Sequence, residues 1–94
     1  RPLGALTQYP APWDENQRLD FAFPEARLAV ECDSRRWHSS SDRFDRDRRR
    51  DREALRHGWI IIRITWTDLD ERPKEVLRTI VVLLDERTVG PRSR

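Results

Sequence analysis

Two short apolar runs, RLDFAF (residues 18–23) and RLAVEC (residues 27–32), constrain the fold of this chain more than any other feature. Each run alternates apolar with polar or small residues, and Pro24 lies between them, which is typical of an antiparallel hairpin. If the connection has an even number of residues, Phe23 pairs with Leu28. We then expect one face of the hairpin to carry the large apolar side chains: Leu19, Phe21, Phe23, Leu28, Val30 and Cys32.

The same register places three carboxylates on the other face of the hairpin. Asp20 lies opposite Glu31, and Asp33 follows two residues further along that face. Burying such acids unpaired costs on the order of several kcal/mol, so something positive must compensate them. The sequence leaves two candidates open: ion pairs with arginine, or a divalent cation. Oxygen ligands alone favour Mg²⁺ or Mn²⁺, which are commonly held by one or two carboxylates plus substrate phosphate.

The remaining chain alternates helical and extended patterns. A helix is predicted over residues 42–57, with N-cap serines before it, Gly58 at the C′ position and mostly solvated side chains. The β-branched run WIIIRITW, residues 59–66, predicts a central strand covered on both sides. A last helix should follow Pro73, and residues 6–9 favour a short strand. Two further sets are predicted: the intrahelical pairs Asp42–Arg46 and Asp45–Arg49, and the apolar stripe Val76, Leu77, Ile80, Leu83 and Leu84.

These elements predict an α/β domain with a mixed β-sheet flanked by helices. We expect residues 1–94 to be a single domain, with an irregular or briefly extended segment over 1–17 and a frayed tail over 88–94. Because the chain begins with arginine rather than methionine, we expect it to be part of a longer chain with other domains. Its oligomeric state does not follow from the pattern.

Composition narrows the classes of partner. The net charge is only +2, but all except one of the 19 basic residues are arginine, which suits phosphate binding and equally reflects a compositional bias. A single cysteine, Cys32, excludes an internal disulfide and a cysteine-based zinc site. No apolar run approaches the roughly 20 residues that span a bilayer, and no signal-peptide pattern is present. We therefore expect a cytoplasmic protein without a membrane partner.

Several side chains after the acidic strand have two interpretations. His38 is either a packed aromatic beside Trp37 or a proton shuttle at neutral pH. The arginine-rich segment 43–52 is either a self-paired solvated helix or a nucleic-acid contact. Arg35 and Arg36 follow the acids directly and are better placed to meet a phosphodiester.

The segments LDFAFPEARLAVECDSRRWH and GWIIIRITWTDL, with a charged helix between them, resemble domain-of-unknown-function family 559. That family lies in the PD-(D/E)XK restriction-endonuclease-like superfamily, close to the very-short-patch-repair endonucleases, and the resemblance covers roughly residues 8–84. It implies a nuclease fold in which Asp20, Glu31 and the main-chain carbonyl of Cys32 bind Mg²⁺ or Mn²⁺. It also implies that His38 assists the chemistry beside Trp37, and Arg48 and Arg63 stand where members also carry arginine.

Two positions depart from the superfamily pattern. Asp33 replaces the usual lysine, which removes the cation normally found near the attacking water and adds a third acid to the predicted metal site. Ser34 stands where glycine is typical, and the N-terminal helix that often contributes a glutamate is not visible in this sequence.

The resulting hypothesis is a metal-dependent endonuclease that hydrolyses phosphodiester bonds in DNA, in repair or defence. Asp20, Glu31 and Asp33 would hold the metal, and His38 would assist proton transfer. Nucleic acid would be held by Arg35, Arg36, Trp37 and Arg48. The alternative is a catalytically silent nucleic-acid-binding or interaction module that retains the fold.

Overall fold

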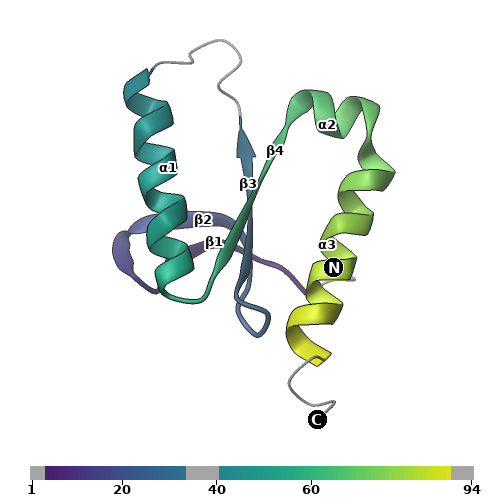
Figure 1. Cartoon of the computed structure of the whole chain (residues 1–94). Coiled ribbons are helices and arrows are strands. Elements are labelled where there is room, and N and C mark those ends of the chain that lie inside the picture. Colours follow the sequence, from purple (N-terminus) through teal and green to yellow (C-terminus); the bar gives the residue numbers. More distant parts are fainter. Residues whose placement is uncertain (1–3, 34–40, 90–94) are drawn as a thin grey trace.

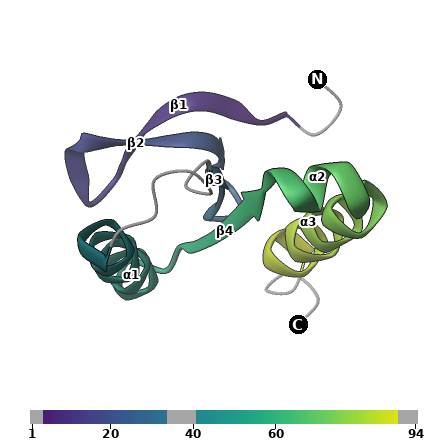
Figure 2. The same cartoon turned by 90° about the horizontal axis from the view of Figure 1, so that it is seen from above.

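The computed structural model describes residues 4–33 and 41–89, which form a four-stranded sheet with helices on both faces (Figure 1). In chain order the elements are β1 (Leu6–Ala11), β2 (Asp14–Phe23), β3 (Leu28–Asp33), α1 (Ser41–Arg56), β4 (Ile60–Thr65), α2 (Trp66–Glu71) and α3 (Pro73–Val89). The strand order is β1-β2-β3-β4; β1 pairs antiparallel with β2, β2 pairs antiparallel with β3, and β4 runs parallel to β3. Seen from above, α1 lies on one side of the sheet and α2 and α3 on the other (Figure 2). The predicted α/β class with a mixed sheet is confirmed.

The β2–β3 hairpin has the register that the apolar pattern predicts. Phe23 pairs with Leu28, and the ladder continues to Phe21 opposite Val30. The connection is the four-residue segment 24–27, closed by a hydrogen bond of 3.0 Å from the Ala26 N–H to the Phe23 carbonyl. Because the loop has an even number of residues, every side chain of β3 falls on the face that the alternation predicts.

Both faces of the sheet are packed, which corrects the expectation of one apolar and one acidic face. Phe23, Leu28 and Val30 join the cluster under α3, as predicted. On the opposite face, Ala22 and Ala29 are fully buried against α1 and Trp59. One residue leaves the predicted face, because Leu19 packs in this second cluster. Leu19 lies beyond the last β2–β3 pair and is paired with Tyr9 of β1, next to the irregularity in the β1–β2 ladder at Pro10 and Ala11. Cys32 keeps its register position opposite Ile64 but is exposed rather than buried.

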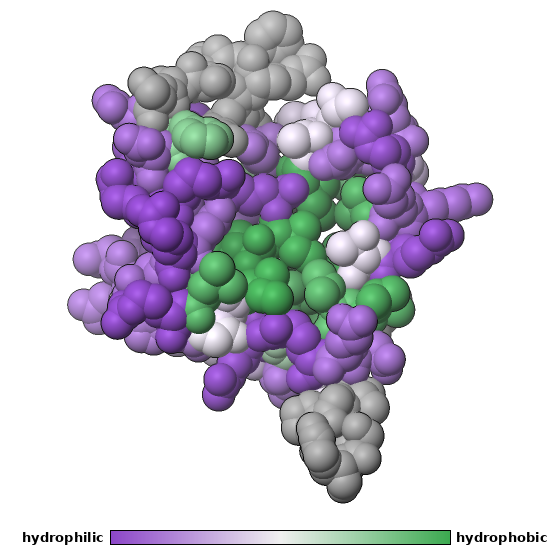
Figure 3. All heavy atoms as spheres, viewed as in Figure 1, coloured by the Kyte–Doolittle hydropathy of each residue, from purple (hydrophilic) through white to green (hydrophobic). Residues whose placement is uncertain are grey.

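Strand β4 lies at the edge of the described sheet, so the prediction of a central strand was wrong. Among the described residues its only strand neighbour is β3. Its apolar run reflects helices on both faces rather than strands on both sides, because Ile60 and Ile62 pack toward α3 while Ile61 packs toward α1. Apolar side chains are visible between the two helices in the space-filling view (Figure 3).

Helix α1 ends as predicted at Gly58, whose φ is +82°. The Trp59 N–H donates to the Ala54 carbonyl at 2.9 Å and the Gly58 N–H donates to the Leu55 carbonyl at 3.0 Å, the pair of bonds that defines a Schellman cap. The predicted ion pairs Asp42–Arg46 and Asp45–Arg49 are wrong. In the described part of the chain those four side chains are exposed and form no ion pair, whereas the acids that face the sheet bind Arg63.

Helix α2 is a short element that the sequence analysis missed by extending the preceding strand through Trp66. Thr65 caps it: its Oγ1 accepts from the Asp68 N–H at 3.0 Å, and an Asp68 carboxylate oxygen accepts from the Thr65 N–H at 3.1 Å. The T-x-x-D spacing was the available signal.

Helix α3 covers the sheet with most of its predicted stripe, since Val76, Ile80, Leu83 and Leu84 pack on the core. Leu77 is the exception and is 53% exposed. Arg87 fixes the end of the helix by donating to the carbonyls of Ala26 and Gly58, both at 2.6 Å. None of the helices in the described ranges offers an apolar stretch long enough to cross a membrane.

Candidate active site

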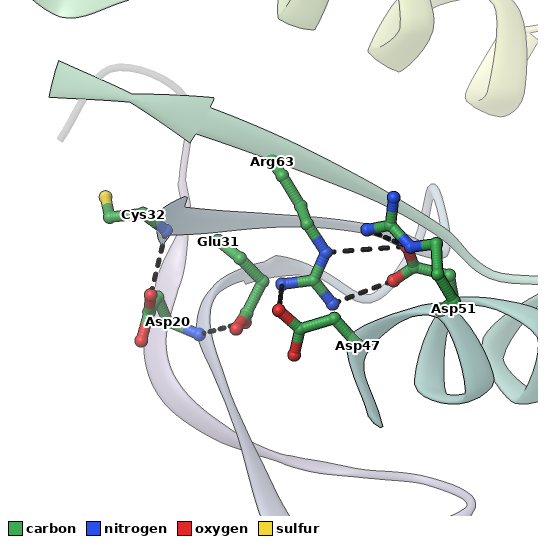
Figure 4. Close-up of polar contacts among 7 residues, drawn as sticks. Asp20, Glu31, Cys32, Asp47, Asp51 and Arg63 are labelled. Atoms are coloured by element: carbon green, nitrogen blue, oxygen red, sulfur yellow. Dashed lines mark hydrogen bonds and ion pairs between the residues drawn. The ribbon is translucent and has the colours of Figure 1, made fainter. Parts of the chain in front are cut away.

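Asp20 on β2 and Glu31 on β3 lie side by side where the β2–β3 ladder stops (Figure 4). An oxygen of the Glu31 carboxylate accepts a hydrogen bond of 2.8 Å from the Asp20 N–H. In return, the Asp20 carboxylate accepts one of 2.9 Å from the Cys32 N–H. The two acids therefore take over main-chain donors that the ladder no longer pairs, and this fixes both carboxylates at the same place.

No arginine neutralises these acids by direct contact in the part of the chain that the structure describes. Neither Asp20 nor Glu31 forms an ion pair there; their hydrogen-bond donors are main-chain N–H groups. Burial raises the pKa of Glu31, and the neighbouring charge of Asp20 raises it further, against the opposing effects of the Asp20 N–H bond and the positive charges of Arg63 and Arg50. Two acids held together in a half-buried site favour a positive charge beside them.

Arg63 supplies a fixed positive charge whose effect reaches Glu31, and it connects β4 to α1. Its position on β4 is paired in register with Glu31 on β3. The guanidinium donates to Asp51 at 2.8 Å and lies 3.7 Å from a carboxylate oxygen of Asp47, with only 17% of the Arg63 side chain exposed. Burial alone would lower the pKa of Arg63, but the bond to Asp51 and the surrounding carboxylates leave that pKa above its ordinary value.

The aspartates that bind Arg63 were not identified from the sequence. Asp47, Asp51 and Ala54 follow one another at i, i+4 and i+7, so they share one face of α1. Ala54 is fully buried, which shows that this face lies on the sheet. The spacing was the available signal, because acids in register with a buried alanine must find a cation on the sheet.

The structure also shows the contacts of Arg48 and the surroundings of the Cys32 thiol, two further residues of the predicted site. Arg48 forms an ion pair of 2.9 Å with Asp51 and lies 5.0 Å from the centre of the Phe44 ring, so its role in nucleic-acid binding stays a prediction. Burial, with the charges of Asp20 and Glu31, raises the pKa of the Cys32 thiol. A raised pKa makes the thiol a poor nucleophile at neutral pH, and the role of the Cys32 main-chain carbonyl as a metal ligand stays a prediction.

The donor set fits a hard divalent cation. Each carboxylate uses one oxygen for a main-chain N–H, and within the described residues the other oxygen, Oδ1 of Asp20 or Oε1 of Glu31, accepts no hydrogen bond. Mg²⁺ is typically held by one or two carboxylates, with waters and substrate phosphate completing its shell. Across residues 4–33 and 41–89, no group of three or more acid, histidine or cysteine side chains could hold a metal ion. The structure thus brings together two of the three predicted carboxylates.

Asp33 ends β3 opposite Thr65 and is half-buried, and its role as a third ligand stays a prediction. The other predicted site residues lie outside the described residues: Arg35, Arg36, Trp37 and His38.

A mixed sheet flanked by helices, with an acid on each of two neighbouring strands, is the arrangement of a restriction-endonuclease-like domain. The chain belongs to the family described as REase_MTES_1575, whose model matches residues 12–84. That match includes the hairpin, both acids, α1 and β4.

The curated relatives that match the chain are themselves uncharacterized proteins, so they add no functional detail to the family assignment. The chain is 35% identical over 71 residues to the uncharacterized protein MT2308 of Mycobacterium tuberculosis strain CDC 1551 / Oshkosh. It matches the uncharacterized protein Rv2248 of strain H37Rv to the same extent. The aligned region covers 76% of this chain and 26% of each relative, so the chain spans about a quarter of the length of the relatives it matches. No solved structure matches the chain significantly.

The raised pKa of Glu31 predicts that Glu31→Gln stabilises the metal-free domain at neutral pH. A carboxyl whose pKa rises on folding binds its proton more tightly in the folded state, so its charged form costs stability above that pKa. The glutamine keeps an oxygen acceptor for the Asp20 N–H but carries no charge. We expect the variant's advantage over the wild type to be present at pH 7 and to shrink as the pH falls toward 4.5, the ordinary glutamate value.

Urea unfolding in EDTA at several pH values measures this difference. Glu25→Gln, at an exposed position in the hairpin turn, is the matched control and should change stability little at any pH. A Glu31→Gln variant that is less stable than the wild type at pH 7 would contradict the account.

The Arg63 ion pairs predict that Arg63→Met lowers the free energy of unfolding by about 2 kcal/mol. This value is smaller than the cost of breaking a fully buried ion pair, because the Arg63 pairs are only partly buried. The substitution removes the cation that Asp47 and Asp51 share across the interface with the sheet, although Asp51 keeps its ion pair with Arg48 on the same helix. The exposed Arg78→Met on α3 makes the same chemical change away from the site and should alter stability by less than about 0.5 kcal/mol. Equal urea midpoints for the two variants would show that Arg63 does not hold α1 to the sheet.

Proposed function

We propose that this domain is a metal-dependent endonuclease that hydrolyses phosphodiester bonds in DNA, related to domain-of-unknown-function family 559 and the very-short-patch-repair endonucleases. The observation that carries the proposal is the pairing of Asp20 with Glu31. Their carboxylates are fixed by reciprocal main-chain bonds, and no ion pair neutralises either of them in the described part of the chain. Membership in a restriction-endonuclease-like family supports the same reading.

Asp20 and Glu31 would hold Mg²⁺ or Mn²⁺ through the carboxylate oxygens that accept no main-chain bond, with the Cys32 carbonyl and Asp33 as further ligands. When bound, such an ion supplies Lewis-acid stabilisation of a phosphoryl oxygen and a more acidic water. The chain's own contribution is geometric. The hairpin register places the two carboxylates, and Arg63 helps to hold α1 beside them.

The segment that follows β3 would complete the site. His38 would move a proton at neutral pH, and Arg35, Arg36 and Trp37 would hold the nucleic acid together with Arg48. The support for these roles is the short distance in sequence from Asp33 and the resemblance to the repair endonucleases. Asp33 in the place of the superfamily lysine means that a proton acceptor other than an amine must serve the attacking water.

Plasmid nicking tests the proposal. We expect the wild type to nick supercoiled plasmid with millimolar Mg²⁺ or Mn²⁺ and to lose that activity in EDTA. Asp20→Asn should reduce the rate roughly 100-fold or more, because it removes a charge from the metal-holding pair and replaces the acceptor for the Cys32 N–H. Asp85→Asn, an exposed position on α3, is the matched control and should nick at the wild-type rate.

The result that contradicts the proposal is equally specific. If neither metal supports nicking by the wild type, or if Asp20→Asn nicks as fast as Asp85→Asn, the endonuclease assignment fails. DNA binding that persists under those conditions would indicate a silent nucleic-acid-binding module.

A further inference from the structure

A groove of about 340 Å³ lies between α1 and the start of β2. Its helical wall carries three arginines, Arg46, Arg49 and Arg50. They follow one another at i, i+3 and i+4, so they project from one side of α1. The space-filling view shows that hydrophilic side chains dominate the surface over this helix (Figure 3).

The three arginines have no structural partner. In the described part of the chain none of them forms an ion pair or a hydrogen bond, and all are exposed. Their neighbours differ: Arg48 is paired with Asp51, and Arg56 with Glu53, each at 2.9 Å. The helix therefore carries arginines that are paired with acids of the same helix and arginines whose guanidinium donors face solvent in a groove.

The acids of the groove do not cancel this charge. Glu53 is bound by Arg56 at 2.9 Å and contacts His57 at 3.2 Å, and these partners lower the pKa of its carboxyl. Asp14 uses one oxygen to accept from the Asn16 N–H at 3.0 Å. With Glu53 satisfied by a cation of its own, the groove keeps an excess of positive charge.

The wall opposite the arginines is rigid and aromatic. The Trp13 indole N–H donates to Gln17 at 3.0 Å, and Gln17 is only 6% exposed. The Trp13 ring also stacks on His57 and meets Trp59 edge to face, with centroids 6.0 and 5.9 Å apart. Grooves that bind nucleic acid combine positive charge along the backbone with aromatic side chains, and this groove carries a half-buried indole together with three arginines that form no ion pair in the described part of the chain.

The groove shares strand β2 with the acidic pair. Gln17 and Asp20 are three residues apart on β2, which is about 10 Å along a strand. That length is comparable to the axial rise of about three nucleotides in one strand of B-DNA. Arg50 also lies close enough to Glu31 for its charge to lower the pKa of that carboxyl.

We propose that this groove, defined by Trp13, Gln17, Arg46, Arg49 and Arg50, binds the DNA backbone next to the phosphate that is cleaved. The arginines contact successive phosphates, and Trp13 packs against a sugar. The inference rests on the proposed nuclease function and adds to it a binding track separate from Arg35, Arg36, Trp37 and Arg48. Contacts of this kind position the duplex without reading its sequence.

Fluorescence anisotropy with a labelled DNA duplex, in EDTA so that no cleavage occurs, tests the proposal across a range of salt concentrations. The test variant is Arg46→Ala/Arg49→Ala. We expect at least tenfold weaker binding and a salt slope, in log K against log [salt], that is shallower by about 2, since each lost phosphate contact removes about 0.9. Arg78→Ala on α3 is the control for lost charge and should lower affinity much less. Because neither mutated arginine has a partner, thermal unfolding should match the wild type.

Each outcome bears on a different part of the account. The groove proposal is wrong if the double variant binds DNA as tightly as Arg78→Ala does, or if the wild type shows no measurable binding. Tighter wild-type binding to an RNA duplex of the same sequence overturns the choice of DNA. Arginine-dependent binding without metal-dependent nicking contradicts the nuclease and leaves the groove standing. If nicking depends on Asp20 but DNA affinity does not depend on Arg46 and Arg49, the nuclease proposal stands and only the groove proposal is contradicted.

Discussion

The register between β2 and β3 is the constraint on which the rest of the structure depends. A connection of four residues joins the strands, so Phe23 faces Leu28 and each following pair is fixed. A slip of one residue would turn the apolar side chains of one strand toward the opposite face. Because two clusters are packed on the two faces, such a slip is costly in both directions. The position of Asp20 beside Glu31 is a direct consequence of this register.

Electrostatics, more than apolar burial, joins α1 to the sheet beside the acids. Among residues 42–56 of that helix only Ala54 is fully buried, and the two residues that precede it on the same face are aspartates. Arg63 satisfies both of them from β4 while its charge also reaches Glu31 (Figure 4). The acidic pair itself keeps no direct arginine partner among the described residues. A site that leaves like charges together lowers the stability of the empty domain and favours a bound cation, a common compromise between stability and function.

Local patterns predicted what depends on neighbours in sequence. The alternation around Pro24 predicted the hairpin and the pairing of Phe23 with Leu28, and Gly58 predicted the end of α1. The number of strands beside β4 was not predictable, because an isoleucine run is buried equally well by two helices. The spacing of Asp47 and Asp51 indicates that they face the sheet, but it does not identify Arg63 as their cation, because the crossover between β3 and β4 brings them together. The short helix α2 had a local signal in Thr65 and Asp68 that the run of β-branched residues masked.

The central claim is that Asp20 and Glu31 form a cation site, and anomalous diffraction from crystals soaked in Mn²⁺ tests it most directly. The account predicts an anomalous peak between the two carboxylates, with oxygen distances near the roughly 2.1 Å typical of a small divalent ion. The peak should vanish in crystals of Asp20→Asn. Carboxylates that are instead bridged by an arginine, with no anomalous density between them, would contradict the claim and make the acids a structural ion pair.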